Sequence, residues 1–323
     1  MKQHLLGLGR QILEAVEIGR RFSMGQKGKI CKVIFMGVGG SAASGDILRT
    51  LMAPKAPVPL VVNRSPALPA WVDDKTLAIA SSYSGNTKEV LHAVSEARRR
   101  LARVILVTSG GRLSGLSEKF KIPCLHIPPG LPPRCAIGYL TFSVVPAFTK
   151  WGWISMTNQE VGETVRALSA IHEARVLEIA RQLFEKFVHV YASSEFLEPV
   201  AFRWRTQLAE NSKTLASHHT LPEMLHNEIE GWRSPKEIVR RSLALFLTDK
   251  EEPSWSRKRR HFAAKIIRSQ GAQVLEIPTQ GKARPTRLFS LISLGDRVSE
   301  ALAKLEGVDP VPVPVLEAIK KIQ

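Results

Sequence analysis

An alternation of short apolar runs with longer amphipathic runs limits what this chain can fold into more than any other feature. The short runs have the length and composition of buried strands, whereas the longer runs show helical periodicity. Strands that alternate with helices in this way form parallel sheets covered by helices. The strand-like runs of a first series are residues 32–37, 59–63, 76–82 and 103–109, and those of a second series are residues 186–194, 242–249 and 272–278.

The chain length indicates two domains. A chain of 323 residues exceeds what one ordinary core organises. The two strand series suggest a duplicated α/β unit, although no residue-by-residue repeat is evident. Residues 150–180 read as a connecting helix. We therefore predict an α/β fold with two doubly wound parallel sheets, one domain at residues 1–155 with a leading helix and a second at residues 156–323.

The formal net charge of +17 is compatible with two classes of partner. A basic surface attracts nucleic acid, but it also raises the local concentration of a small dianion such as a sugar phosphate. The densest basic run, residues 256–269, has the pattern of a solvated helix face. No stacking-aromatic pattern or zinc-finger spacing accompanies it. We therefore expect a small-molecule sugar phosphate as the partner, and no nucleic acid.

Cysteine usage and hydropathy indicate a cytoplasmic protein. Cys31, Cys124 and Cys135 are an odd number without a C-x-x-C pair, so neither a disulfide framework nor a zinc site is expected. The first 22 residues read as an amphipathic helix and lack the features of a signal peptide. No apolar run approaches the ~18 residues of a membrane span. We expect a soluble protein with no membrane partner and no metal.

Two loops rich in glycine and hydroxyl residues follow strands of the first series, GVGGS at residues 37–41 and SYSGNT at residues 82–87. Ligands of open parallel sheets bind beyond the carboxyl ends of the strands. Glycines allow close approach of the backbone, and the first amides of a helix are unpaired donors at the positive end of its dipole. The loops therefore predict a phosphate site, although Ser41 and Thr87 could also be ordinary helix N-caps.

A dinucleotide site is a rival interpretation of the first loop. Gly37-x-Gly39-x-x-Ala42 after a strand satisfies the loose fingerprint. That fingerprint requires an acid near the end of the second strand to hold the ribose hydroxyls, whereas this chain has Asn63 and Arg64 there. An arginine could hold a 2′-phosphate, so an NADP-binding oxidoreductase is an alternative. The loop at residues 82–87 would have no role in such a site.

The two loops together resemble the sugar isomerase (SIS) domain, a flavodoxin-like fold that binds phosphosugars. Four later segments, PPRCA, LAENSK, LPEMLHNEIEGW and DPVPVPVLEAIKK, are similar in the same order to motifs of the bifunctional phosphoglucose/phosphomannose isomerases of archaea and bacteria. The resemblance spans nearly the whole chain. It implies two SIS-type domains and an aldose-ketose isomerase that interconverts glucose 6-phosphate, and mannose 6-phosphate, with fructose 6-phosphate through a cis-enediolate.

The resemblance also implies site residues. Glu210 corresponds to the base, Arg134 to the enediolate stabiliser and His226 to the ring-opening group. In the family this histidine comes from the neighbouring subunit, so a homodimer is expected, and no cofactor is required. Lys320 and Val313 match substrate-binding positions near the C-terminus. The residues implied to hold the phosphate are Gly40, Ser41, Ser82, Ser84 and Thr87.

These roles also make chemical sense. Moving a proton between C1 and C2 needs a carboxylate, such as Glu210, that takes it from one carbon and returns it to the other. A fixed guanidinium stabilises the developing negative oxygen, and a histidine that titrates near neutral pH suits ring opening. Each residue also has a non-catalytic interpretation. Glu210 could pair with Lys213 at i+3 on a helix surface, and Arg134 and His226 could be surface or structural groups.

Two departures from the family pattern bear on the activity, and one alternative function is left open. Val313 replaces a family threonine linked with acceptance of mannose 6-phosphate, so glucose 6-phosphate isomerisation is the safer half of the activity. Leu225 replaces the first histidine of the family's H-H-N motif. A non-catalytic SIS phosphosugar sensor is the alternative from another functional class, but only about 31 residues precede the first strand, too few for a helix-turn-helix module.

Overall fold

The computed structural model describes residues 1–23 and 29–322, apart from the side chains of Lys320 and Lys321. The chain divides into two compact units. We call Gly7–Val165 the first unit, and Met1–Leu6 together with Arg166–Gln323 the second unit. The division falls inside helix α8 (Asn158–Ser169).

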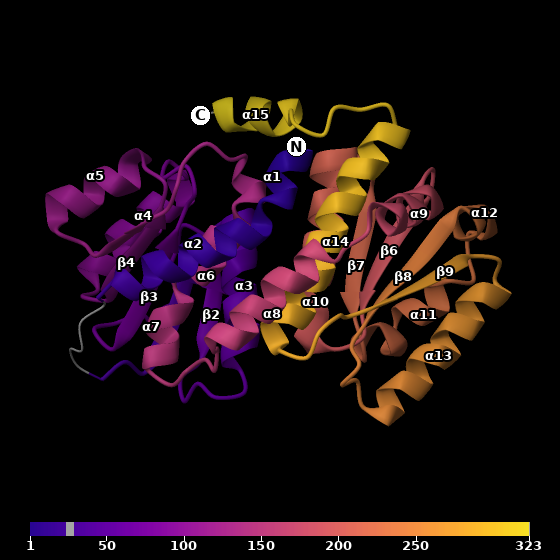
Figure 1. Cartoon of the computed structure of the whole chain (residues 1–323), viewed down its shortest axis with the longest axis horizontal. Coiled ribbons are helices and arrows are strands. Elements are labelled where there is room, and N and C mark those ends of the chain that lie inside the picture. Colours follow the sequence, from indigo (N-terminus) through magenta and orange to yellow (C-terminus); the bar gives the residue numbers. More distant parts are fainter. Residues whose placement is uncertain (24–28, 323) are drawn as a thin grey trace. The chain divides into compact units, whose positions relative to one another are not determined.

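The first unit contains a five-stranded parallel sheet in the order β2-β1-β3-β4-β5 (Figure 1). Successive strands move to one side of β1 and then to the other side, so β1 and β3 are adjacent and Met36 pairs with Ala80. The strands are β1 (Lys32–Met36), β2 (Leu60–Asn63), β3 (Thr76–Ser81), β4 (Arg103–Thr108) and β5 (Cys124–His126). The helices are α2 (Leu8–Arg21), α3 (Gly40–Met52), α4 (Lys88–Arg99), α5 (Gly111–Phe120), α6 (Ile137–Phe142) and α7 (Val145–Lys150).

Helices cover both faces of this sheet. Successive side chains of a strand point to opposite faces, so the consecutive apolar residues of these strands must be buried on both sides. Ile34 and Met36 pack on one face with Val90 of α4 and Leu113 of α5. Phe35 points to the other face, where α3 passes so closely that a Cβ on Gly45 would lie 2.5 Å from the phenyl ring. Every residue of β3 is buried, as a strand covered on both faces requires.

The second unit contains a four-stranded parallel sheet in the order β7-β6-β8-β9. Its strands are β6 (Phe187–Ala192), β7 (Ala216–Thr220), β8 (Ser242–Thr248) and β9 (Gln273–Pro278). Its helices are α1 (Lys2–Leu6), α9 (Glu173–Leu183), α10 (Glu198–Gln207), α11 (Glu228–Gly231), α12 (Lys236–Arg240), α13 (Ser254–Ser269), α14 (Arg284–Leu305) and α15 (Pro314–Lys321). With the first sheet, it confirms the predicted α/β class of two parallel sheets flanked by helices.

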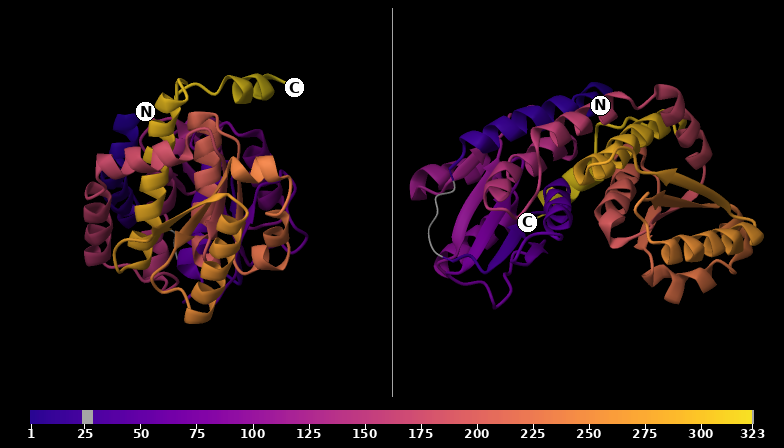
Figure 2. Two further views of the ribbon diagram at one scale, coloured as in Figure 1. Left: turned by 90° about the vertical axis from the view of Figure 1, so that its right-hand side faces the viewer. Right: turned by 60° about the horizontal axis from the view of Figure 1, so that its bottom comes forward.

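Helix α13 packs against β9, whereas α10 packs against β6 and β7 and lies next to α14 (Figure 2). Tyr191 and Phe246 pack with Ile267 of α13 in one core cluster. On the other side α10 packs against α14, because Gly295 leaves room for Trp204 and the indole nitrogen donates to the carbonyl of Leu291 at 2.9 Å. No described helix is long and apolar enough to cross a lipid bilayer.

The strand β7 was absent from the sequence prediction. Four of its five residues, ASHHT, are polar, and all five are only partly buried. An edge strand of this kind lacks the apolar alternation from which strands are recognised. The predicted leading helix is also divided, since α1 ends at Leu6 and α2 begins at Leu8.

Candidate active site

The two glycine- and hydroxyl-rich loops lie side by side at the switch point of the first sheet. The first loop leads from β1 into α3, and the second leads from β3 into α4. Because β1 and β3 are hydrogen-bonded parallel neighbours, both helices begin at the same edge of the sheet. Ligands of open α/β sheets bind at this point, where the strand order reverses.

Ser41 is not a helix N-cap, and Thr87 occupies an N-cap without making a side-chain capping hydrogen bond. Gly39, with φ 58°, occupies the N-cap of α3, so Ser41 lies inside the helix. Thr87 occupies the N-cap of α4, but its side chain makes no capping hydrogen bond. Neither N-cap residue therefore donates or accepts a side-chain capping bond, and the first amides of α3 and α4 are not capped by these side chains. Such amides are the donors that bind an anion.

The loop at residues 82–87 is held in a compact form. Ser82 Oγ and Thr87 Oγ1 are 2.8 Å apart, and the amide of Gly85 donates to the carbonyl of Ser82 at 3.1 Å. Gly85 has a φ of +68°, and a Cβ there would lie 1.8 Å from the carbonyl oxygen of Gly110. Only glycine fits at residue 85, and the loop therefore packs directly against the residues that follow β4. Ser84 is exposed in the same loop.

Arg134 lies beside the loop at residues 37–41. It belongs to a short 3₁₀ helix, Pro133–Cys135, and is 7% exposed. A Cβ on Gly40 would lie 3.4 Å from the carbonyl oxygen of Pro133 and 3.5 Å from Cα of Arg134. The first turn of α3 therefore contacts the segment that carries the arginine. The structure thus brings together Gly40, Ser41 and Arg134, which were predicted from separate motifs.

Tyr83 is a residue of this site that the sequence reasoning missed. Its hydroxyl donates to the carbonyl of Pro128 at 2.9 Å and accepts from the amide of Leu131 at 3.0 Å. Burial raises the pKa of Tyr83, so the phenol stays protonated and can donate. The side chain joins the loop at residues 82–87 to the proline-rich segment before Arg134. Its position between Ser82 and Ser84 was the available signal.

The end of β2 does not resemble a dinucleotide site. The amide group of Asn63 donates to the carbonyls of Ser65 and Ala67, and the guanidinium of Arg64 forms an ion pair with Asp46 of α3. Burial raises the pKa of Asp46, and the nearby Arg64 opposes this shift. Both side chains that would have to hold the ribose or a 2′-phosphate are therefore engaged with the protein.

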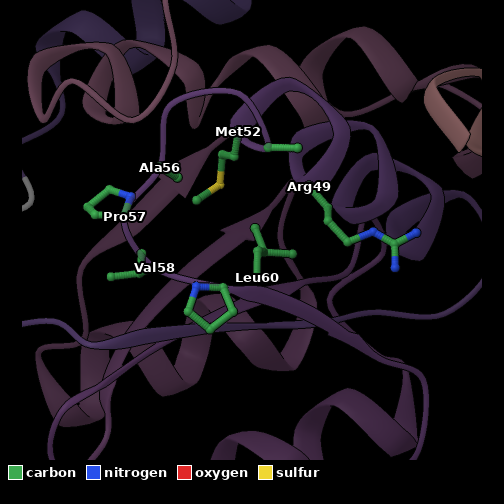
Figure 3. A pocket seen from close by; sticks show the side chains of 8 residues that line it. Arg49, Met52, Ala56, Pro57, Val58 and Leu60 are labelled. Atoms are coloured by element: carbon green, nitrogen blue, oxygen red, sulfur yellow. The ribbon is translucent and has the colours of Figure 1, made fainter.

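A hollow elsewhere in the first unit is lined mainly by apolar side chains, including Met52, Val58 and Leu60 (Figure 3). It lies where α3 ends and β2 begins. That is the edge of the sheet opposite the two loops, so the hollow is separate from them.

Glu210 lies in a π-helical turn of the second unit, Leu208–Ser212, which continues α10. Such turns insert one extra residue and occur often at functional sites. The next residue, Lys213, has a left-handed backbone with φ 57°. Its ammonium group donates to the carbonyl of Glu210 at 2.9 Å. The backbone of the π-helical turn, at Glu210, therefore accepts a hydrogen bond from the side chain of Lys213.

His226 ends a short 3₁₀ helix, Glu223–His226, and is exposed. The chain just after it is anchored to the sheet. Glu228 accepts a hydrogen bond from the hydroxyl of Tyr191 at 2.5 Å, and its carboxylate lies 3.7 Å from His189 Nδ1. Burial raises the pKa of Glu228, but the nearby His189 and the hydrogen bond from Tyr191 outweigh it, and the pKa lies below its ordinary value.

The indole nitrogen of Trp232 donates to Tyr191 Oη at 2.9 Å and completes this anchor. The sequence reasoning missed these supporting side chains, although Glu228 and Trp232 lie in the HNEIEGW run that identified His226.

The two C-terminal positions lie at or in α15. Val313 occupies the N-cap of this helix and accepts a hydrogen bond from the amide of Glu317 at 3.0 Å. The backbone of Lys320 belongs to α15, but its side chain lies outside what the structure describes.

The switch point of the second sheet, between β6 and β8, is occupied by protein charges. Asp249 follows β8, is buried, and accepts a hydrogen bond from Thr279 Oγ1 at 3.0 Å. Arg287 Nη1 lies 3.5 Å from Asp249 and 2.5 Å from Glu251. Fixed carboxylates would repel a phosphate dianion. Within residues 1–23 and 29–322, no group of three or more His, Cys, Asp or Glu residues could hold a metal ion.

Two stretches of this chain match known protein families. Residues 29–121 match the SIS domain, and residues 173–322 match the bacterial phospho-glucose isomerase C-terminal SIS domain. A bifunctional phosphoglucose/phosphomannose isomerase of Caldicellulosiruptor bescii is 38% identical, over 99% of this chain and 98% of that protein. One of Thermoplasma volcanium is 36% identical, over 91% and 92%. A hypothetical protein of Thermus thermophilus shares the fold, with a TM-score of 0.79, 16% identity, and coverage of 98% of this chain and 88% of that one.

Proposed function

The chain belongs to the family of bifunctional phosphoglucose/phosphomannose isomerases, and on that premise we propose that it interconverts glucose 6-phosphate, and mannose 6-phosphate, with fructose 6-phosphate. The observation that carries the proposal is the pair of phosphate loops at the β1–β3 switch point, with Arg134 packed against the first of them.

The phosphate is bound by neutral donors in this proposal. Amides at the starts of α3 and α4 point out of the helices, and the hydroxyls of Ser41, Ser82, Ser84 and Thr87 add further hydrogen bonds. The positive ends of two helix dipoles face the dianion. The contact between Ser82 and Thr87 supports the assignment of both residues to one phosphate, because hydroxyls 2.8 Å apart can reach the same phosphate group.

The proton transfer is assigned to Glu210. Its carboxylate removes the proton from C2 of the aldose phosphate, or from C1 of the ketose phosphate, and returns it to the other carbon. Negative charge then develops on oxygen in the cis-enediolate, and the guanidinium of Arg134 stabilises it. His226 moves a proton between the ring oxygen and the anomeric hydroxyl so that the closed sugar opens.

We further propose that the active form is a homodimer in which His226 acts in the site of the partner subunit. The exposure of His226 supports this, since a side chain that acts in the site of a neighbouring subunit must lie at the surface of its own subunit.

The three cysteines are all free, which fits a reducing cytoplasm. Glucose 6-phosphate is the preferred aldose, because Val313 lacks the hydroxyl of the family threonine.

The assay that tests the function uses purified protein with fructose 6-phosphate and measures glucose 6-phosphate and mannose 6-phosphate separately. We expect Glu210→Gln to lower kcat by about 10²–10⁴-fold, the usual contribution of a general base. The matched control is Glu178→Gln, which changes an exposed glutamate of α9 in the same unit. If wild type forms neither aldose, a non-catalytic sensor is the better interpretation. Equal rates for Glu210→Gln and wild type would exclude Glu210 as the base.

A further inference from the structure

The ammonium group of Lys213 connects two distant parts of the second unit. It donates to the carbonyls of Glu210 at 2.9 Å and Asn211 at 3.2 Å, both in the π-helical turn. It also donates to the carbonyls of Asp309 at 2.8 Å and Pro312 at 3.0 Å. We call these four oxygens the carbonyl cage. An ammonium group has three N–H donors, so these four acceptors are enough to satisfy all of them.

The backbone conformation of Lys213 does not explain why a lysine occupies this position. Its φ of 57° lies in the left-handed region, where glycine or asparagine is favoured at a helix C-terminus. Its own amide donates to the carbonyl of Leu208, a hydrogen bond that any non-proline residue would make. A lysine at this position accepts an unfavourable backbone conformation, and the contacts of its ammonium group with the carbonyl cage offset that cost.

The distal half of the carbonyl cage belongs to the connection between α14 and α15 (Figure 1). This connection leads directly into Val313, the N-cap of α15. Val311 and Val315 are 45% and 70% exposed, so their side chains contribute little apolar burial to hold the segment in place. Charge-assisted hydrogen bonds to Lys213 are therefore well suited to fix it.

We propose that Lys213 is a positioning residue that ties the turn carrying Glu210 to the segment carrying Val313 and α15. The proposal rests on the proposed function, since it assigns the base to Glu210 and a substrate contact to Val313. Its consequence is that the proton-transferring carboxylate and the C-terminal side of the sugar site hold one mutual position. Misplacement of a reacting group by about 1 Å can lower a rate by about 10²-fold.

The variant Lys213→Gly separates the tether from the backbone. Glycine relieves the left-handed strain but has no ammonium group, so we expect an unchanged or higher Tm together with a fall in kcat of about 10–100-fold. KM for fructose 6-phosphate should change less than threefold, because the phosphate loops belong to the first unit. A residue that only stabilised the fold would instead lower Tm and leave kcat of the folded enzyme unchanged.

The chain offers a matched control in Lys121→Gly. Lys121 also follows a helix, α5, also has a left-handed backbone, with φ 54°, and is exposed. Among the described contacts its ammonium group has no hydrogen bond or ion pair. We expect Lys121→Gly to raise Tm in the same way and to leave kcat and KM unchanged.

Hydrogen exchange tests the tether without any assay of activity. In Lys213→Gly the amides of residues 309–319 should exchange faster than in wild type, while those of the first unit should not change. Equal exchange of this segment in the two proteins overturns the proposal, as does a kcat of Lys213→Gly equal to that of an active wild type. A wild type without isomerase activity would contradict the proposed function, and the exchange measurement would still decide whether Lys213 holds the segment.

Discussion

The hydroxyl of Tyr83 donates a hydrogen bond to the carbonyl of Pro128 at 2.9 Å, across 45 residues of sequence. This bond joins the second phosphate loop to the proline-rich segment that leads to Arg134. In the proposed function, one buried phenol thereby supports both the loop assigned to phosphate binding and the segment that leads to Arg134. Tyr83 itself is expected to stay protonated over the working pH range, because burial raises its pKa.

Removal of that hydroxyl should therefore affect catalysis. We expect Tyr83→Phe to lower kcat/KM by about tenfold, and to lower the free energy of unfolding by about 1–2 kcal/mol because Pro128 and Leu131 lose a partner. Steady-state kinetics and urea unfolding measure the two effects. The control is Tyr139→Phe, which removes a buried phenol that bonds Glu14 in the same unit. It should cost similar stability but leave kcat/KM unchanged; a matching loss of kcat/KM would contradict the specific role of Tyr83.

Substitution of Gly85 should disturb phosphate binding. In Gly85→Ala the new Cβ would lie 1.8 Å from the carbonyl oxygen of Gly110, so the loop at residues 82–87 must move. We expect KM for fructose 6-phosphate to rise at least tenfold. Gly152→Ala is the control, because Gly152 also has a positive φ, of +75°, but no atom within 4 Å of the added Cβ. An unchanged KM in Gly85→Ala would argue against this loop as the phosphate site.

The hydroxyl missing at residue 313 should affect the choice of aldose. We expect Val313→Thr to raise the ratio of mannose 6-phosphate to glucose 6-phosphate turnover by about three- to tenfold, the effect of about one hydrogen bond. Separate kcat/KM values for the two aldoses measure it. Val315→Thr makes the same change at an exposed position of α15 and should leave the ratio as in wild type. Equal ratios for Val313→Thr and wild type would exclude this position as a determinant.

His218 should make stability depend on pH. Burial lowers its pKa to about 4, with Arg205 and His219 adding to the shift. An unfolded histidine takes up its proton near pH 6.5, whereas the folded protein keeps His218 neutral down to about pH 4. The folded state therefore loses stability as the pH falls from about 6.5 to about 4, by about 1–2 kcal/mol once solvent screening is allowed for.

The measurement is urea unfolding at a series of pH values. His218→Gln should flatten this part of the stability curve, whereas His261→Gln, on the exposed side of α13, should leave it as in wild type. A curve for His218→Gln with the wild-type slope between pH 6.5 and pH 4 would contradict the prediction.

Much of the first unit could be predicted from local patterns. The strands β1, β3 and β4 are apolar and buried, so their periodicity is visible in the sequence, and the two loops follow directly from where these strands end. The strand β7 could not be found in this way, because four of its five residues are polar and all five are only partly buried. The π-helical turn that holds Glu210 also has no local signature, since one extra residue per turn leaves composition unchanged.

Some details of the site depend on contacts between residues far apart in the sequence. Ser41 and Thr87 have the residue types of N-caps, yet the structure gives neither side chain a capping bond, because Gly39 takes the N-cap of α3 and Thr87 contacts Ser82 instead. Lys213 had the spacing of a surface ion pair with Glu210, whereas its ammonium group also binds carbonyls almost a hundred residues away. Sequence spacing describes neighbours within one element and carries no information on such contacts.

The amino-acid sequence by itself determined the α/β class, the two phosphate loops and, through an ordered series of motifs, the family that the relatives confirm. These features are local, so short runs of residue types are enough to encode them. Only the tertiary structure decided that the two loops follow hydrogen-bonded neighbouring strands, that Tyr83 joins the second loop to the segment before Arg134, and that Lys213 donates to carbonyls of the connection before α15. Such relationships arise from strand order and packing, in which residues distant in the chain come within hydrogen-bonding distance.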